Sequence, residues 1–498
     1  MGIIARQSAK SSIVSLSSSL IGVLATLFIY TLDLDAYGFS QILLAASILL
    51  APFASLGLSG TVIRFYPEYG KTEAGRASFL SFLLVGTSVG SFLLVVGYYF
   101  LGVPILRELS APDNDFEFYI TYAAPILWLT VLQLFAGIVE TYTMNFHRIT
   151  VQTLATALLP KFILPGIILL HLHYEWSYMQ LSVALILMRV AVLVLLLLYL
   201  YRIGELRLTS RIGRVTRSAA FRRLMHYSAY GIIGAIGGKI ALQIDTVSLG
   251  AYVTNEKVGV YQIIVFAASV ITIPYYALTR ISSPILTQAI EAGNFVEVKA
   301  IYQRSSLLLG FIGIVVFTGI AVSLEDIFVV TGQEAAFTGG LTAFMFVGLS
   351  KLFDLIGSVN GQIISFSHLY RYNPVLIVVL ALMNIALNTY FIAYLEWGIV
   401  GAAAATMLSL GLFNGIKTAI IYFKLGIQPL LPELIWPVLM ACVLIPLWNA
   451  LVLDFHPVVN ICIRSALTGA AFLAYGLGTA HLPEFKEYLR SFTARLSG

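Results

Sequence analysis

Residues 226–280 decide the fold, and they read HYSAYGIIGAIGGKIALQIDTVSLGAYVTNEKVGVYQIIVFAASVITIPYYALTR. The stretch holds two apolar runs joined by a short polar turn at residues 254–257. Each run is long enough to cross a bilayer, which takes about 20 mostly apolar residues in a helix. Lys239 lies near the middle of the first run and Asp245 near its end. A charge at bilayer depth costs roughly 2.5–3.5 kcal/mol on insertion scales, so such a residue is usually functional or paired.

The composition of the whole chain agrees with a membrane environment. Of its 498 residues, 59% are apolar and only 11% are charged, and the mean hydropathy is +0.91. A soluble chain carries about 25% charged residues to keep its surface hydrated. We therefore expect an all-α polytopic membrane protein. The two cysteines, Cys442 and Cys462, both fall in apolar runs, so neither a disulfide framework nor a metal site is indicated.

Apolar runs along the chain predict about fourteen transmembrane helices. We place them at residues 12–32, 39–61, 77–101, 118–140, 150–172, 178–201, 227–250, 258–280, 303–323, 338–360, 373–394, 399–422, 432–453 and 458–479. The first run is serine-rich and suits burial against protein or a watery cavity. A second run follows it almost at once, so we interpret it as a retained helix rather than a cleaved signal peptide.

The distribution of basic residues gives an independent test of this count. With the N-terminus in the cytoplasm, 22 of the 29 Lys and Arg fall in cytoplasmic segments or helix ends. Only Arg107, Lys257 and Arg464 fall on the external side. A miscounted helix would invert every later loop and destroy this bias. The pattern therefore predicts an even number of spans with both termini in the cytoplasm.

The longest polar break, residues 202–225, carries seven arginines. One interpretation is a patch that binds anionic lipid or nucleic acid. The other, which we favour, is a cytoplasmic linker that follows the positive-inside rule. We expect no nucleic-acid partner. No external loop is long enough to form a domain.

An internal repeat indicates that the chain is duplicated. Tyr37-Gly38, Gln41-Ile42 and Pro52 match Val258-Gly259, Gln262-Ile263 and Pro274, at an offset of 221 that becomes 222 after one inserted residue. With six helices per half, the two halves cross the membrane in the same direction. The expected domains are an N-lobe (1–201), a basic cytoplasmic linker (202–225), a C-lobe (226–424), and a helix pair with a cytoplasmic tail (425–498).

The chain carries no recognisable catalytic or cofactor motif. H-E-x-x-H, G-x-S-x-G and P-loop patterns are absent, and His171 and His173 lack the acidic or cysteine neighbours of a metal site. We expect no cofactor, no metal and no catalytic residue.

Lys239 and Gln243, four residues apart, share one face of their helix and point together into whatever polar space exists. Gly231, Gly234 and Gly238 share a neighbouring narrow face with Asp245, and we expect another helix to pack closely there. Two interpretations of Lys239 stay open: it faces a cavity, or it pairs with a carboxylate on an adjacent helix.

Three further cations lie at mid-depth. Lys161 follows Pro160 in a run with two prolines, which predicts a bent or broken helix. Arg189 lies among leucines and valines with no acidic neighbour in sequence, whereas Lys351 has Asp354 three residues on and is expected to pair with it. Deep cations outnumber deep acids, and this surplus indicates an anionic cargo.

The segment Ile244-Asp245-Thr246-Val247-Ser248-Leu249-Gly250, followed by Val258-Gly259-Val260-Tyr261, resembles the helix 7–8 signature of bacterial oligosaccharide flippases. These belong to the multidrug/oligosaccharidyl-lipid/polysaccharide exporter superfamily. The segment from Asp35 to Gln41 is similar to the same family's helix 1–2 turn. Fourteen spans, a basic linker and a terminal helix pair also agree with this family.

The resemblance implies two lobes around a central cavity. It further implies that undecaprenyl-diphosphate-linked oligosaccharide is flipped across the bacterial inner membrane by alternating access, for O-antigen, capsule or exopolysaccharide assembly. The implied partners are this lipid-linked saccharide, membrane lipids and polysaccharide assembly enzymes. Lys239 best fits the cavity cation for the diphosphate, and Arg64 and Arg280 fit headgroup entry. The full set of candidate substrate-binding residues is Lys239, Gln243, Asp245, Arg64, Arg280, Lys161 and Arg189.

Two alternatives are weighed against a flippase. A drug or organic-cation antiporter of the same superfamily predicts twelve helices and buried acids in the cavity. A membrane polysaccharide polymerase or glycosyltransferase predicts a large external loop. This chain matches each of these patterns less well than it matches the pattern of a flippase. The chain departs from the peptidoglycan-precursor branch of the superfamily it resembles, because the core of its first helix lacks a charged residue. Within that resemblance, lipid II is a less expected cargo.

Overall fold

The computed structural model describes residues 3–110, 116–146, 149–334, 337–451 and 453–479, and every regular element in these ranges is a helix. Thirteen helices are long and apolar enough to cross a membrane, and a shorter apolar helix, Ser17–Leu32, precedes them. The thirteen are Leu34–Ala54, Glu73–Leu109, Ala123–Met144, Thr150–Tyr174, Tyr178–Arg202, Phe221–Tyr252, Asn255–Tyr276, Phe295–Val330, Gly340–Gly357, His368–Tyr394, Gly398–Leu425, Pro432–Ala450 and Pro457–Gly478. The all-α multi-pass class is confirmed, and each predicted run has its helix. The expected tail beyond residue 479 lies outside the described residues.

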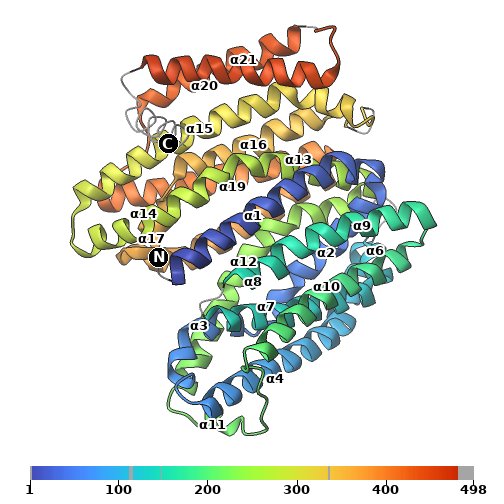
Figure 1. Cartoon of the computed structure of the whole chain (residues 1–498), viewed down its shortest axis with the longest axis vertical. Coiled ribbons are helices and arrows are strands. Elements are labelled where there is room, and N and C mark those ends of the chain that lie inside the picture. The colour runs from blue at the N-terminus through green and yellow to red at the C-terminus, as the bar shows by residue number, and fades with distance from the viewer. Residues whose placement is uncertain (1–2, 111–115, 147–148, 335–336, 452, 480–498) are drawn as a thin grey trace. The chain divides into compact units, whose positions relative to one another are not determined.

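Contacts divide the chain into two compact units, residues 1–259 and 260–498. The first unit includes α12 (Phe221–Tyr252), which packs along α2 (Leu34–Ala54) and α3 (Leu58–Tyr69) (Figure 1). This packing places the contact boundary after Gly259, beyond the linker at residues 202–225. The lobes expected from the sequence repeat therefore do not coincide with the two units defined by contacts. The assignment of lobes remains a prediction.

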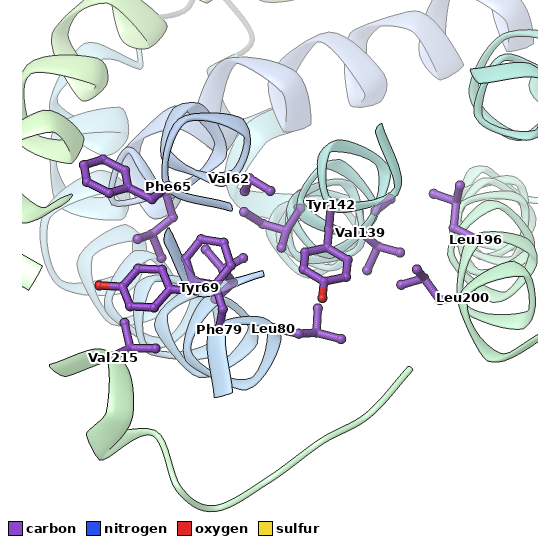
Figure 2. Close-up of a cluster of buried hydrophobic side chains, with 14 of the residues drawn as sticks. Val62, Phe65, Tyr69, Phe79, Leu80, Val139, Tyr142, Leu196, Leu200 and Val215 are labelled. Carbon is purple, nitrogen blue, oxygen red and sulfur yellow. The ribbon is translucent and has the colours of Figure 1, made fainter. Parts of the chain in front are cut away.

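The linker is folded onto the first unit. Its short helix α11 (Gly213–Thr216) buries Val215 in a core with Phe65 and Tyr69 of α3 and Phe79 of α4 (Glu73–Gly97) (Figure 2). Polar contacts fix both ends of the linker: Arg207 pairs with Glu73, Arg76 with Glu205 at 2.9 Å, Arg223 with Glu68 at 3.1 Å, and Tyr69 bonds Ser218 at 2.7 Å.

The second predicted span, residues 39–61, is not one helix. α2 ends at Ala54 and α3 begins at Leu58, with positive φ angles of 47° at Leu56 and 67° at Gly57. Glycine is required at position 57 because a Cβ there would lie 2.0 Å from the Ser228 carbonyl oxygen of α12. A hydropathy run does not reveal this break, since both pieces are apolar.

The serine-rich first helix packs on the fifth predicted span. A π-helical turn, Leu154–Leu158, precedes α9 (Leu159–Tyr174) and Pro160. The Ser18 hydroxyl of α1 (Ile3–Phe28) donates to the Ala157 carbonyl oxygen in that turn, at 2.9 Å. The predicted irregularity near Pro160 is confirmed, and α1 supplies a polar partner to it.

A reciprocal crossing of α2 and α13 (Asn255–Ser269) follows the offset of the sequence repeat. A Cβ added at Gly38 would lie 1.8 Å from the Asn255 carbonyl oxygen, and one at Gly259 would lie 2.2 Å from that of Leu34. Leu34 and Asn255 are 221 residues apart, as are Gly38 and Gly259. Residues at equivalent positions of the sequence repeat therefore contact each other within the first unit.

A second pair of equivalent positions shares an unusual backbone. Glu175 and Glu396, also 221 residues apart, have φ angles of 49° and 53°, and each precedes a tryptophan. Left-handed backbone is uncommon for glutamate, so its recurrence at this offset supports the duplication.

In the second unit, the terminal helices α20 (Ile435–Ala450) and α21 (Pro457–Gly478) pack on α15 (Phe295–Val330). Arg464 lies within α21, where it is buried and pairs with Asp326 of α15 at 3.2 Å. Asn460 donates to the same carboxylate, also at 3.2 Å. The assignment of Arg464 to the external side of the membrane remains a prediction; the structure adds that its side chain is a buried contact between two helices.

Candidate functional site

A cavity of about 390 Å³ lies within the first unit, among α2, α3, α7 (Ala123–Met144) and α12. Its wall mixes apolar, small, hydroxyl, amide and charged side chains. The lining residues are Ile48, Ala51, Pro52, Ser55, Gly57, Ser59, Gly60, Gln133, Leu134, Gly137, Glu140, Thr141, Met144, Gly231, Ala235 and Lys239. The break between α2 and α3 contributes Ser55 and Gly57, so the interruption of this helix shapes the cavity.

Lys239 reaches this cavity from α12 with an exposed side chain. Gly231 and Ala235 line the same cavity because positions four residues apart lie on one side of a helix. Among the described residues of the first unit, a Cβ at Gly234 or Gly238 would meet no heavy atom within 4 Å, so the close packing expected at these two glycines is not seen within this unit. The small residues here leave open space beside the lysine.

Glu140 contributes a carboxylate to the same wall from α7. The Thr156 hydroxyl donates to its Oε1 at 3.2 Å. Among the described residues, no carboxylate oxygen lies within the 4.0 Å ion-pair limit of Lys239 Nζ. Of the two interpretations of Lys239, the structure therefore shows the lysine facing a cavity, with an acid on the wall and no direct ion pair.

Glu140 is not among the seven site residues predicted from the sequence. The predicted span of residues 118–140 ended at this glutamate, whereas α7 runs from Ala123 to Met144. That shift of about one turn moves Glu140 inside the helix. A positive signal was available in Gln133, Gly137, Glu140 and Thr141, whose spacing puts polar or small residues on one helical face.

The remaining candidates on α12 and α3 do not line this cavity. Gln243 is half-buried and Asp245 is buried, both further along α12 than Lys239. Arg64 is exposed on α3, with its guanidinium 4.5 Å from the centre of the Tyr227 ring.

The other candidate cations are also distributed elsewhere. Lys161 is half-buried on α9, and Arg189 lies on α10 (Tyr178–Arg202). Arg189 Nε is buried and has no hydrogen-bond partner within the described part of the chain. The side chain of Arg280 lies outside the described residues. Among the described side chains, the cavity joins Lys239 to Glu140, and Gln243, Asp245, Arg64, Lys161 and Arg189 do not line it. The roles of all six other candidates remain proposals.

Comparison with solved structures identifies the class to which this fold belongs. The chain is similar to "Lipid II flippase MurJ, inward closed conformation", with a TM-score of 0.71 and 15% identity over 93% of this chain and 98% of that one. It is also similar to the "Inward-facing conformation of a multidrug resistance MATE family transporter of the MOP superfamily", with a TM-score of 0.58, 14% identity, and coverage of 86% and 98%. The chain therefore shares the multi-pass helical fold of these two proteins.

The family model described as "Polysaccharide biosynthesis protein" matches residues 8–290, more than half of the chain. The chain belongs to this family. The resemblance noted in the sequence is thereby confirmed, and family and fold are those of a transporter rather than an enzyme.

Two relatives come from Haloferax volcanii. "Probable low-salt glycan biosynthesis flippase Agl15" is 25% identical over 189 residues, 38% of this chain and 39% of the relative. "Probable flippase AglR" is 22% identical over 202 residues, 40% and 41% of the two chains. The alignments thus span about two fifths of each relative.

Proposed function

We propose that this protein flips a lipid-linked oligosaccharide across a membrane by alternating access, with an undecaprenyl-diphosphate carrier. The observation that carries the proposal is the cavity containing Lys239 inside a unit built of membrane-spanning helices. The family, together with the printed names of the two relatives, supports a glycan-related cargo.

The chemistry of the cavity wall suits such a cargo. Saccharide hydroxyls cannot enter hydrocarbon without losing their hydrogen bonds, at a free-energy cost of roughly 2–7 kcal/mol each. Gln133, Thr141 and Glu140 offer replacement partners, and Lys239 offers a positive charge for a diphosphate. The polyprenyl tail needs no such wall and stays in the lipid.

The arginine-rich linker supports an orientation. Because positive residues are retained on the cytoplasmic side, we place residues 202–225 and both termini in the cytoplasm. We place the protein in the bacterial inner membrane, with O-antigen, capsule or exopolysaccharide as the product. Polysaccharide assembly enzymes would then receive the flipped unit.

Replacing Lys239 tests the proposal. In vesicles containing a fluorescent undecaprenyl-diphosphate saccharide, Lys239→Ala should slow flipping about 10- to 100-fold, because a hydrogen bond to a charged group contributes about 1.5–3 kcal/mol. Lys257→Ala is the matched control, since Lys257 is exposed in the first turn of α13 and does not line the cavity. Equal flipping by the wild type and Lys239→Ala would remove Lys239 from the cargo site.

The second candidate function is an organic-cation antiporter, and Glu140 is the observation that favours it. Such antiporters use buried carboxylates to exchange protons or sodium for cargo. The two functions predict different effects when Glu140 is neutralised: loss of cation efflux for an antiporter, and stronger binding of an anionic headgroup for a flippase.

A further inference from the structure

A second cavity, of about 670 Å³, lies at one end of the first unit, where α9 turns into α10. It is lined by Asp33, Tyr122, His171, Leu172, Glu175, Trp176, Ser177, Tyr178 and Met179. Its volume falls in the range of roughly 300–1,000 Å³ that is usual for small-molecule sites. The candidate site around Lys239 shares none of these residues.

The turn that forms this cavity is held in one conformation. Glu175 ends α9 with left-handed backbone, and the Trp176 amide donates to the His171 carbonyl oxygen at 3.3 Å. Ser177 and Gln180 then form a reciprocal capping box at the start of α10, with distances of 2.7 and 3.3 Å. The cavity wall is therefore preorganised, which lowers the entropy lost when a ligand binds.

Two elements contribute polar atoms that face each other. Asp33 caps α2 by accepting a hydrogen bond from the Ala36 amide at 2.9 Å, and its other carboxylate oxygen lies 3.6 Å from His171 Nε2. His171 Nδ1 is buried and has no hydrogen-bond partner among the residues the structure describes. Glu175 adds an exposed carboxylate.

Aromatic rings form the rest of the wall. The ring of Tyr178 stacks on the buried ring of Phe39, with 4.5 Å between the ring centres, and the ring of Tyr122 meets Phe39 edge-on at 4.9 Å. Packing against Phe39 therefore restricts the positions of both tyrosine rings. Trp176 packs nearly parallel to Tyr174, with 12° between the ring planes. Flat rings offer an apolar surface to the C–H face of a sugar, while carboxylates and imidazole accept from its hydroxyls.

We propose that this cavity binds the saccharide portion of the cargo, through uncharged sugar rings. This inference rests on the proposed flippase function and deepens it by adding a saccharide subsite. The lining contains Asp33 and Glu175 but no lysine or arginine, so its charge disfavours a diphosphate. Within the described residues, no group of three or more His, Cys, Asp and Glu is placed to hold a metal ion.

The position of the cavity assigns it to one membrane face. α10 begins at this cavity and ends at Arg202, where the basic linker starts. A helix of its length spans a bilayer, so the cavity lies at the face opposite the linker. Figure 1 shows α11 of the linker and α6 (Glu117–Thr121), which directly precedes Tyr122, at opposite ends of this unit. The sugar would meet this cavity after crossing.

The test measures saccharide binding directly. Purified full-length protein in lipid nanodiscs is titrated with lactose, maltose and chitobiose, and with pyrophosphate, by ligand-observed NMR. We expect the wild type to bind at least one disaccharide. Trp176→Ala and Asp33→Asn should each weaken the affinity about tenfold, because each removes one ring contact or one hydrogen bond to a charged group. Asparagine at position 33 still caps α2, so this variant should fold. Trp397→Ala is the matched control, because Trp397 follows Glu396 in the equivalent turn of the second repeat.

Either of two results would overturn the subsite: no disaccharide binds the wild type, or binding survives both variants unchanged. Filling the cavity with Leu172→Trp gives a second check, because it should abolish binding without removing any polar contact. A parallel flipping assay separates the hypotheses. Wild-type flipping without disaccharide binding rejects the subsite alone, whereas disaccharide binding without flipping rejects the flippase function.

Discussion

Lys239 and Glu140 place opposite charges on the wall of one cavity inside a membrane-spanning unit. Moving a charged side chain out of water costs several kcal/mol, and a direct ion pair only partly offsets that cost. No such pair forms between described residues at Lys239. The cavity wall therefore offers both a basic and an acidic side chain to an occupant.

Glu140→Gln tests which charge serves the cargo. For an anionic headgroup, removing this negative charge should lower the substrate concentration at half-maximal flipping by about five- to thirtyfold, since two charges several ångströms apart in a water-filled cavity interact with about 1–2 kcal/mol. Glu108→Gln is the matched control, because Glu108 is exposed on α5 (Val103–Leu109). A higher half-saturation for the lipid-linked saccharide, together with lost efflux of ethidium, would favour the antiporter instead.

The sequence located the lysine of this site but not its acidic neighbour. Lys239 is easy to find because it is a lysine within an apolar run. Glu140 lay at the margin of its run, and hydropathy defines such margins only to within several residues. The cavity is also lined by the break between Ala54 and Leu58, where Gly57 lies against Ser228 of a helix distant in the chain. No local pattern encodes that contact.

At the scale of helices, Arg464 and Asp326 attach the terminal helix pair to α15. The guanidinium also donates to the Val322 and Leu451 carbonyl oxygens, at 3.1 and 3.2 Å. The terminal pair could be counted from hydropathy, but its attachment could not be predicted. Arg464 and Asp326 are far apart in the chain, and each alone resembles an ordinary residue near a helix end.

Arg464→Ala should destabilise the second unit by about 3–5 kcal/mol, because it leaves the Asp326 carboxylate buried without a counter-charge. Thermal unfolding in detergent measures this as a lower midpoint. The double variant Asp326→Leu/Arg464→Met removes both charges and should recover most of the loss. Arg107→Ala serves as the control, since Arg107 is exposed on α5. A double variant as unstable as Arg464→Ala would argue against the ion pair as the cause.

At the scale of the whole molecule, the duplication seen in the sequence recurs as geometry. The offset of 221 residues relates the glycine crossing of α2 and α13, and it relates the left-handed glutamates at two helix turns. Sequence alone could find the repeat because glycines and turn residues are constrained locally. It could not show that Gly38 and Gly259 contact each other, since these residues are far apart in the chain.

This crossing predicts a conformational effect. A methyl group at Gly38 or Gly259 would overlap a backbone carbonyl oxygen, so Gly38→Ala and Gly259→Ala should each force α2 and α13 apart to a similar extent. We expect Ser40→Cys, fully buried beside the crossing, to become reactive toward an impermeant thiol reagent in both variants. Cys442 and Cys462 are exposed and are first replaced by serine. Gly97→Ala is the control, because a Cβ there would meet no atom within 4 Å. If the cysteine at position 40 were as unreactive in folded Gly38→Ala protein as in the Gly97→Ala control, the close crossing of α2 and α13 would not be what keeps position 40 buried.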